Sequence, residues 1–431
     1  MGEMNTREID IRAMALAARS AGRALALSTT AARNAALQGI AERLANVGPE
    51  LWEANQADVA YATEAGIAPA LLDRTTLNAK RLQGMVDGCR DVAALPDPLG
   101  EVFEGHTLAN GMVLAKKRVP LGLLATLFES RPNVTIDIGA LAIKSGNGVI
   151  MRGGKESLQT NIVLVGIVQE ALAAAGLPAD AVQLVTSTDR ALVPQLLAMD
   201  DLIDLVIPRG GPGLQGLVKQ LARMPVAYGG IGVCHLFVDA SADLDRSIPL
   251  INNAKTQAPS VCNALDTVLV HRSVAGDLIP ALVTDLTSAG VKMYLDEASM
   301  ATLDAISIAD AGDLLASATA EHYGVEFLSL QLSVKVVSTL DEAIAHIQRH
   351  GTNHSDGILT DSVASAERFL NEIDSAATYV NCSTRFTDGG VFGLGAEVAI
   401  STQRMHARGP MGLRELTTYK WIVRGDYHIR P

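Results

Sequence analysis

The stretch "GNGVIMRGGKES", residues 146–157, places a short apolar strand directly before a glycine turn and a helical segment that follows Lys155. The same order recurs in "LGLLATLF" (121–128), "AVQLVTS" (181–187) and "DLVIPRGG" (204–211), each followed by a helix-like segment. Strands that alternate with helices through short glycine turns are typical of parallel sheets. The sequence therefore predicts a doubly wound α/β domain built on these strands.

Three other regions flank or follow this core. Residues 6–94 have helical spacing of Ala, Leu, Arg and Glu, with one helix expected to end at Gly48. Asn110 and Gly111 stand between alternating segments, which is a strong hairpin signal. A second α/β segment runs from residue 232 to residue 384, and the chain finishes with another predicted strand.

Composition limits the kinds of protein that fit. The 431 residues suggest two or three domains, and 48% hydrophobic with 19% charged residues suits a compact globule. The net charge of −12 argues against nucleic acid as a partner. The longest apolar run, residues 121–128, is too short to span a bilayer. We expect a soluble, cytoplasmic protein without a membrane partner.

Four widely spaced cysteines, none in a C-x-x-C pair, indicate reduced thiols and no disulfide framework or zinc site. Cys262 is the notable one. In "APSVCNALDTVLVH" (258–271), Pro259 and Ser260 favour a turn before a short β-branched strand. A cysteine outside a disulfide is more often a small buried hydrophobe than a nucleophile, so the residues alone leave both interpretations open.

Two glycine turns carry basic residues directly after predicted strands. They are "MRGGKES" (151–157), with Arg152 and Lys155, and "IPRGGPGLQG" (207–216), with Gly210 and Gly211. Such turns let backbone N–H groups approach a phosphate at a helix N-terminus, although a tight βα turn explains a single one equally well. Two of them, each with a cation, favour a phosphorylated cofactor.

Two polar stretches remain. "LFESRPNVTID" (127–137) places Asn133 just after a strand, where turn chemistry is the commoner explanation. "HGTNHSDGI" (350–358) holds two histidines four residues apart, but on a predicted loop and without a third ligand, so we expect no metal site there.

These pieces occur together in one family. The run "VSTLDEAIAHIQRHGTNHSDGI" (337–358) resembles the signature of the glutamate-5-semialdehyde dehydrogenases, also called gamma-glutamyl phosphate reductases, of the aldehyde dehydrogenase superfamily. The blocks "ESRPNVTIDIGALAIKSGN", "MRGGKE", "IPRGG", "CNALDTVLVH" and "GPMGLRELTTYKW" extend the resemblance over nearly the whole chain. The resemblance implies NADPH-dependent reduction of L-glutamate 5-phosphate to the semialdehyde and phosphate, the second step of proline synthesis.

The resemblance also implies roles for single residues. Cys262 matches the nucleophile that forms a thioester, and Asn133 resembles the asparagine of the oxyanion hole. Glu326 falls where relatives hold the nicotinamide ribose, although the usual Phe-Gly-Pro does not follow it. Arg152 stands where relatives carry a lysine on the adenosine ribose, with Lys155 nearby for a 2′-phosphate.

For the substrate's amino and carboxylate groups, polarity and placement suggest four residues: Arg385, His354, Ser355 and Asp356.

The architecture that the resemblance implies is a Rossmann-type cofactor domain, an α/β catalytic domain and a small β oligomerisation arm. We expect the NADP-binding domain at 1–104 and 119–235, with 376–404 as a further candidate part, and the catalytic domain at 236–375. The arm is expected at 105–118 and 405–431, where a strand given to a neighbouring subunit would cover an exposed sheet edge.

Two other hypotheses stay open at this point. The chain could be a coenzyme A-acylating aldehyde dehydrogenase, which an acyl-transfer assay with phosphate against coenzyme A would distinguish. It could also be a non-catalytic scaffold that partners glutamate kinase, which measurable turnover would exclude.

Overall fold

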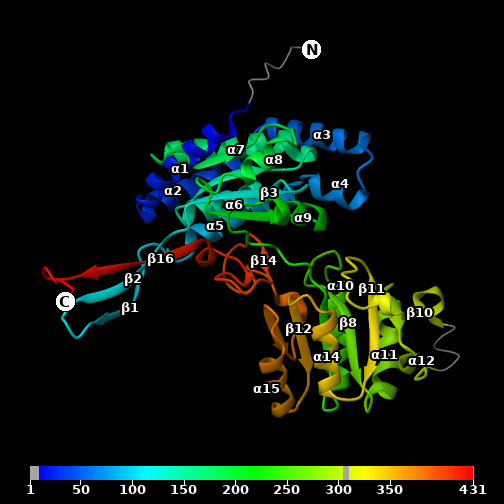
Figure 1. The fold of residues 1–431 in the computed structure, drawn as a ribbon. Helices are drawn as coiled ribbons and strands as arrows, with labels where there is room; N and C mark the ends of the chain where they lie inside the picture. The colour runs from blue at the N-terminus through cyan, green and yellow to red at the C-terminus, as the bar shows by residue number, and fades with distance from the viewer. Residues whose placement is uncertain (1–8, 304–309, 431) are drawn as a thin grey trace. The chain divides into compact units, whose positions relative to one another are not determined.

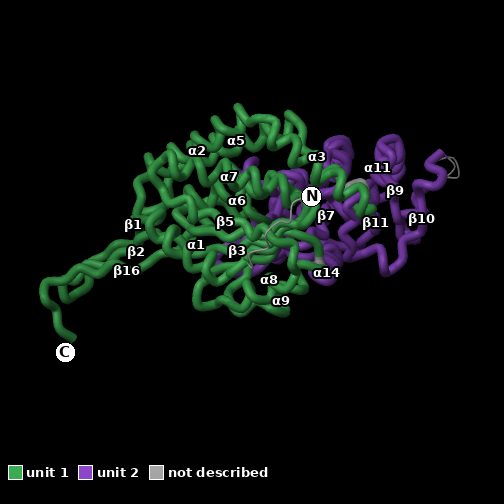
Figure 2. Tube along the Cα trace, turned by 90° about the horizontal axis from the view of Figure 1, so that it is seen from above, with its two compact units in different colours: residues 1–229, 393–399, 410–431 green, residues 230–392, 400–409 purple. Residues whose placement is uncertain are grey.

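The computed structural model describes residues 9–303 and 310–430, and the chain divides into two compact units (Figure 2). Unit 1 comprises Met1–Gly229, Gly393–Ala399 and Pro410–Pro431. Unit 2 comprises Gly230–Phe392 and Ile400–Gly409.

Unit 1 begins with a series of helices, as the spacing predicts. They are α1 (Ile11–Ala26), α2 (Thr30–Ala45), α3 (Pro49–Glu64), α4 (Pro69–Thr75) and α5 (Ala79–Ala94). Side chains cap several of them: Asp10, Thr29 and Asn78 each accept a hydrogen bond from a backbone N–H in the first turn. The sequence predicted that a helix would end at Gly48, and this prediction is wrong. The C-cap of α2 is Asn46, and Gly48 is instead the N-cap of α3.

A four-stranded parallel sheet forms the core of unit 1, in the order β5-β4-β3-β6 (Figure 1). Its strands are β3 (Leu123–Phe128), β4 (Gly148–Arg152), β5 (Val182–Leu184) and β6 (Leu205–Arg209), connected by α6 (Asn133–Lys144), α7 (Leu158–Ala174), α8 (Leu192–Leu197) and α9 (Pro212–Leu221). The chain moves outward from β3 to β5 and returns to pair β6 on the other side of β3. This reversal creates a switch point at the carboxyl end of the sheet, where ligands bind in such folds.

Helix α7 with its preceding turn, Lys155–Ala174, is long and apolar enough to cross a membrane by length and composition. Half of that window is buried, and α7 packs against α2, α3 and α6. Core helices of globular domains meet the same criteria, so the apolar composition of α7 agrees with its place in the core of unit 1.

A close backbone approach fixes α1 on the sheet. A Cβ on Gly22 of α1 would lie 2.7 Å from the backbone nitrogen of Gly148, at the start of β4. A Cβ on Gly148 would lie 2.6 Å from the carbonyl oxygen of Ala18. Both positions therefore require glycine because the helix and the strand touch through their main chains.

Unit 2 contains a seven-stranded parallel sheet in the order β10-β9-β11-β8-β7-β12-β13. Its strands are β7 (Cys234–Val238), β8 (Leu265–His271), β9 (Lys292–Leu295), β10 (Leu315–Ser317), β11 (Gln331–Val337), β12 (Ser355–Leu359) and β13 (Ala377–Val380). Its helices are α10 (Leu244–Thr256), α11 (Ala275–Ser288), α12 (Glu297–Met300), α14 (Leu340–His350) and α15 (Val363–Glu372). The short strands β14 (Ile400–Ser401) and β15 (Gly409–Pro410) pair with each other.

Alternate residues of the central strands face two separate apolar clusters. Leu236 and Val238 of β7 pack with residues of α10 and α11, whereas Phe237 between them packs with residues of α14 and α15. Each face of the sheet is thus covered by helices (Figure 1). Burial on both faces explains the continuous apolar runs of these strands. The predicted parallel α/β fold is confirmed.

A separate antiparallel sheet, β1-β2-β16, extends from the rest of unit 1 (Figures 1 and 2). It consists of β1 (Val102–Thr107), β2 (Val113–Pro120) and β16 (Thr417–Arg424). The predicted hairpin joins β1 to β2, and Gly111 adopts φ +90° in the turn. Tyr419, Trp421 and Val423 are each about half exposed along β16, so this arm presents a row of apolar side chains.

The α1–β4 approach gives a test of the fold with a matched control. We expect Gly22→Ala to lower the free energy of unfolding by about 1–2 kcal/mol, because overpacking typically costs 1–3 kcal/mol and outweighs the gain in helix propensity. A Cβ added to Gly84 of α5 would meet no other atom within 4 Å, so Gly84→Ala should raise stability by roughly 0.5–1 kcal/mol. Thermal and urea unfolding of the two variants measure this difference. An equal gain in the free energy of unfolding for both variants would contradict the packing argument.

Candidate active site

Cys262 lies in the turn between α10 and β8 and is partly exposed. Cys89 and Cys234 are buried, and Cys382 is exposed at the end of β13. Burial raises the pKa of Cys89 to about 12 and raises the pKa of Cys234 well above its ordinary value. Neither buried thiol is therefore suited to ionise and attack a substrate.

The main chain of Cys262 is held from two sides. A Cβ on Gly232 would lie 1.6 Å from the Cys262 carbonyl oxygen, so the segment before β7 packs backbone to backbone against the turn. The Cys234 thiol donates a hydrogen bond to the same oxygen, with an Sγ–O distance of 3.3 Å. Cys234 thus helps to fix the Cys262 turn, a role that its place in an apolar strand pattern did not reveal.

A buried ion pair joins the two ends of this turn. Lys255, near the end of α10, donates from Nζ to the carbonyl oxygen of Leu265 at 2.8 Å and lies 3.6 Å from Asp266 Oδ1. Both side chains are at most 2% exposed. Burial lowers the pKa of Lys255 and raises the pKa of Asp266 to about 6.

Asp266 extends the connection to two other segments. Its carboxylate accepts hydrogen bonds from the backbone N–H groups of Cys234, at 3.4 Å, and Phe327, at 3.1 Å. Sequence reasoning missed both members of the pair, because "NNAKT" and "NALDT" read as an ordinary helix end and strand start. Their separation of 11 residues shows no periodicity that would indicate contact.

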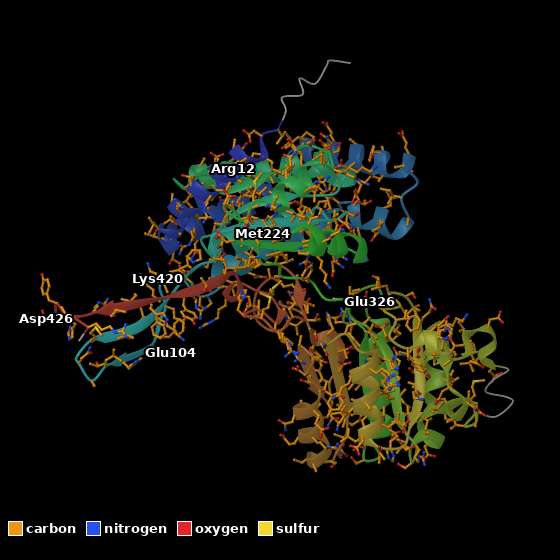
Figure 3. All side chains as sticks on the ribbon, viewed as in Figure 1. Arg12, Glu104, Met224, Glu326, Lys420 and Asp426 are labelled. Carbon is orange, nitrogen blue, oxygen red and sulfur yellow. The ribbon has the colours of Figure 1, made fainter. Side chains whose placement is uncertain are left out.

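Glu326 lies in the loop before β11 (Figure 3). Its Oε1 accepts a hydrogen bond from the Gly232 N–H at 2.9 Å. Burial raises the pKa of this carboxyl group. Glu326 is therefore attached to the same segment that packs on the Cys262 carbonyl, and the two are linked within unit 2.

The four substrate-binding candidates occupy two different environments. His354, Ser355 and Asp356 are 0% exposed. Asp356 accepts from the His235 ring Nδ1 at 2.9 Å, and Ser355 Oγ lies 2.6 Å from Thr387 Oγ1. Arg385 lies on the short helical turn Thr384–Phe386 and is partly exposed. The loop predicted at 350–358 is wrong: His350 ends α14 and Ser355–Leu359 forms β12. The buried residues of this stretch form an interior network behind the turn that contains Arg385.

The candidates in unit 1 follow the carboxyl ends of adjacent strands. Asn133 is the first residue of α6, after β3, and its Nδ2 donates to Asp137 Oδ2 at 2.9 Å. Burial raises the pKa of Asp137 to about 6. Arg152 ends β4, and Gly210 follows β6, the strand on the other side of β3.

Carboxylate groups of the chain itself accept hydrogen bonds from the backbone N–H groups of these turns. Gly211 N–H donates to Glu129 Oε2 at 3.0 Å. At the start of α7, Asp58 accepts from the N–H groups of Gln159, at 3.1 Å, and Thr160, at 2.8 Å. A phosphate at either helix terminus would have to displace a carboxylate, so positively charged side chains are the more accessible anion ligands.

Two such side chains stand beside the β4 turn. Arg152 Nε is buried without a hydrogen-bond partner among the described residues. Burial is the main cause that lowers the pKa of Arg152, and Arg190 adds to it. Lys155 is exposed, with Nζ 5.5 Å from the ring centroid of Tyr61. This arrangement fits a phosphorylated dinucleotide better than an uncharged ligand. In the described ranges, no group of three or more His, Cys, Asp or Glu is placed to hold a metal ion.

Comparison with known proteins agrees with this geometry. The model of the aldehyde dehydrogenase family matches residues 3–322. A gamma-glutamyl phosphate reductase from Roseiflexus castenholzii is 52% identical over 429 residues, which is 99% of this chain and 99% of that protein.

Solved structures show the same relationship. A crystal structure of gamma-glutamyl phosphate reductase from Thermotoga maritima superposes with a TM-score of 0.93 at 43% identity, covering 98% of this chain and 100% of that one. An acetylating aldehyde dehydrogenase from Geobacillus thermoglucosidasius, at 18% identity and a TM-score of 0.70 over 98% of this chain and 97% of that one, is similar in fold alone. The chain belongs to the aldehyde dehydrogenase family and, within it, to the gamma-glutamyl phosphate reductases.

Proposed function

We propose that this enzyme reduces L-glutamate 5-phosphate to L-glutamate 5-semialdehyde and phosphate with NADPH, the second step of proline biosynthesis, through a thioester on Cys262. One observation carries the thioester: Cys262 is partly exposed in a turn whose main chain is fixed by Gly232 and Cys234. The relatives named above supply the substrate class, because they are gamma-glutamyl phosphate reductases over nearly the full length of the chain.

The first half of the reaction is an acyl transfer. A free carboxylate is too poor an electrophile for hydride transfer, so the substrate arrives as an acyl phosphate. The Cys262 thiolate attacks the acyl carbon, and the phosphate leaves with the electrons of its C–O bond. In this proposal Asn133 Nδ2 and the Cys262 backbone N–H stabilise the tetrahedral oxyanion, where one lost donor typically costs about 10²–10³ in rate.

The second half is reduction of the thioester. Bound NADPH supplies the hydride. The thioester carbon accepts it, and the resulting thiohemiacetal releases the aldehyde and regenerates the Cys262 thiol. We propose that Glu326 holds the nicotinamide ribose, and that Arg152 and Lys155 hold the phosphorylated adenosine. The buried Nε of Arg152, which has no hydrogen-bond partner in the described ranges, and the exposed ammonium of Lys155 support the adenosine assignment.

The cellular setting follows the same proposal. All four cysteines are thiols outside any disulfide, which suits a reducing cytoplasm. The half-exposed apolar residues of β16 support a homo-oligomer in which the arm packs on a second subunit. Glutamate kinase, which makes an unstable acyl phosphate, is a candidate partner for direct transfer.

The nucleophile is tested by Cys262→Ala, with Cys382→Ala as the matched control at an exposed thiol. We expect the first variant to lose more than about 10³-fold in kcat while still binding NADPH, because no other group can form the thioester. The control should keep wild-type turnover. Residual activity of Cys262→Ala above a few per cent would return Cys262 to a packing role.

Cofactor choice is tested by Lys155→Ala. Loss of a charge-assisted hydrogen bond to a 2′-phosphate costs about 1.5–3 kcal/mol, which corresponds to a roughly tenfold or larger rise in the Kd of NADPH. The Kd of NADH should change less than about twofold. Fluorescence titration of both nucleotides measures the split, and equal effects would show that Lys155 does not contact the 2′-phosphate.

Water should be a poor acyl acceptor. Hydrolytic aldehyde dehydrogenases use a glutamate before the cysteine as a general base, but the corresponding stretch "PVAYGGIGV" (225–233) contains no Asp, Glu or His. A general base contributes about 10²–10⁴-fold, whereas phosphate is already a nucleophile. Oxidation of the semialdehyde, supplied as pyrroline-5-carboxylate with NADP⁺, should therefore require phosphate or arsenate. Comparable rates in a buffer without either anion would contradict this, and dependence on coenzyme A would indicate the acylating alternative.

A further inference from the structure

Arg385 is held beside the nucleophile by backbone anchors. Its turn, Thr384–Phe386, is attached to Asn263, the residue that follows Cys262. Thr384 Oγ1 donates to the Asn263 carbonyl oxygen at 2.7 Å. Asn263 Nδ2 donates to the carbonyl oxygens of Thr387, at 2.7 Å, and Arg385, at 3.4 Å. These bonds fix the backbone of Arg385 next to the Cys262 turn.

A buried polar network supports the turn from behind. Thr387 Oγ1 lies 2.6 Å from Ser355 Oγ and 2.6 Å from the Tyr379 hydroxyl. Ser355 Oγ lies 2.9 Å from His354 Nδ1. Because Thr387, Ser355 and His354 are fully buried, the network supports the turn from the interior of unit 2.

The guanidinium of Arg385 is oriented but not neutralised. Its Nε donates to Gln257 Oε1, at the C-cap of α10, at 2.8 Å. Within residues 9–303 and 310–430, no carboxylate lies within ion-pair distance of it. Burial lowers the pKa of Arg385, while Asp388, the Cys262 thiolate and Cys234 act in the opposite direction. The hydrogen bonds from Asn263 hold this charged residue close to the Cys262 turn.

We propose that Arg385 binds the phosphoryl group of the acyl phosphate and the inorganic phosphate that it becomes, an assignment that rests on the proposed function. As the C–S bond forms, the C–O bond to phosphate breaks and the leaving oxygen keeps the electron pair. A planar guanidinium matches the phosphate oxygens and stabilises the charge that they gain. The phosphoryl oxygen is bonded to the carbon under attack, whereas the substrate's α-carboxylate is separated from it by three carbon atoms. An arginine whose turn is hydrogen-bonded to Asn263, the residue after Cys262, is therefore placed for the phosphate.

The reverse reaction tests this assignment. With pyrroline-5-carboxylate and NADP⁺, we expect Arg385→Gln to raise the KM for phosphate at least tenfold and to change the KM for pyrroline-5-carboxylate less than about threefold. Arg385→Lys keeps the charge without the bidentate fork, so its KM for phosphate should lie between those of the wild type and Arg385→Gln. Arg272→Gln is the matched control, because Arg272 follows the opposite end of β8, roughly 20 Å along the strand, and should leave both KM values unchanged. A rise confined to the KM for pyrroline-5-carboxylate would overturn the proposal and assign Arg385 to the α-carboxylate.

Alkylation provides a readout that does not depend on turnover. The measured quantity is the rate ratio of Cys262 alkylation, the rate with anionic iodoacetate divided by the rate with neutral iodoacetamide, in a Cys382→Ala background. We expect this ratio to fall when Arg385→Gln is added. Phosphate should protect against iodoacetate only when Arg385 is present. An unchanged rate ratio in Arg385→Gln would overturn the anion site. If the ratio falls as expected but the wild type shows no phosphate-dependent turnover, the proposed reaction fails and the anion site stands.

Discussion

The approach of Gly232 to the Cys262 carbonyl is the constraint on which the site depends. A Cβ at position 232 would lie 1.6 Å from that oxygen, so no side chain fits there. The bare main chain also places the Gly232 N–H against Glu326, and two residues later the Cys234 thiol reaches the same carbonyl. The Cys262 turn is therefore positioned through its backbone. The Cys262 side chain need not serve as an anchor, which is what the proposed nucleophile requires because it must react and be released.

The segment that contains Gly232 also lacks a side chain that could activate water. Residues 225–233 contain no acidic side chain or histidine, and Gly232 has no room for any side chain against the Cys262 carbonyl. A base in this position would activate water against a thioester. The close backbone contact at Gly232 is therefore compatible with the proposed thioester, which must persist until hydride arrives. A hydrolytic relative would have to fit both a close backbone contact and a glutamate into the same short segment.

Local patterns in the sequence were sufficient for the fold and for the turn that contains Cys262, the proposed nucleophile. Alternating strands and helices predicted the parallel sheets, Asn110 and Gly111 predicted the hairpin, and Pro259 indicated the turn before Cys262. The supporting contacts were invisible because they join distant segments: Cys234 to the Cys262 carbonyl across 28 residues, and Asn263 to Thr387 across 124. The stretch 350–358 was predicted as a loop, but His350 ends α14 and Ser355–Leu359 forms β12. Its residues His354, Ser355 and Asp356 are buried, where His354 Nδ1 lies 2.9 Å from Ser355 Oγ and Asp356 accepts from the His235 ring.

Two cations belong to segments that are bonded to the residues around Cys262, and their charges are paired differently: Lys255 has a carboxylate partner, and Arg385 is oriented by a neutral amide. Lys255 is fully buried, and Asp266 and the Leu265 carbonyl occupy its ammonium group. A buried charge without such a partner would be strongly destabilising, so this lysine cannot also hold a ligand. Arg385 is only partly buried, is oriented by the neutral Gln257 amide, and has no carboxylate within ion-pair distance among the described residues. In a chain with a net charge of −12, acidic partners are plentiful. An arginine that is attached to the Cys262 turn without such a partner is therefore suited to the external anion that we propose for it.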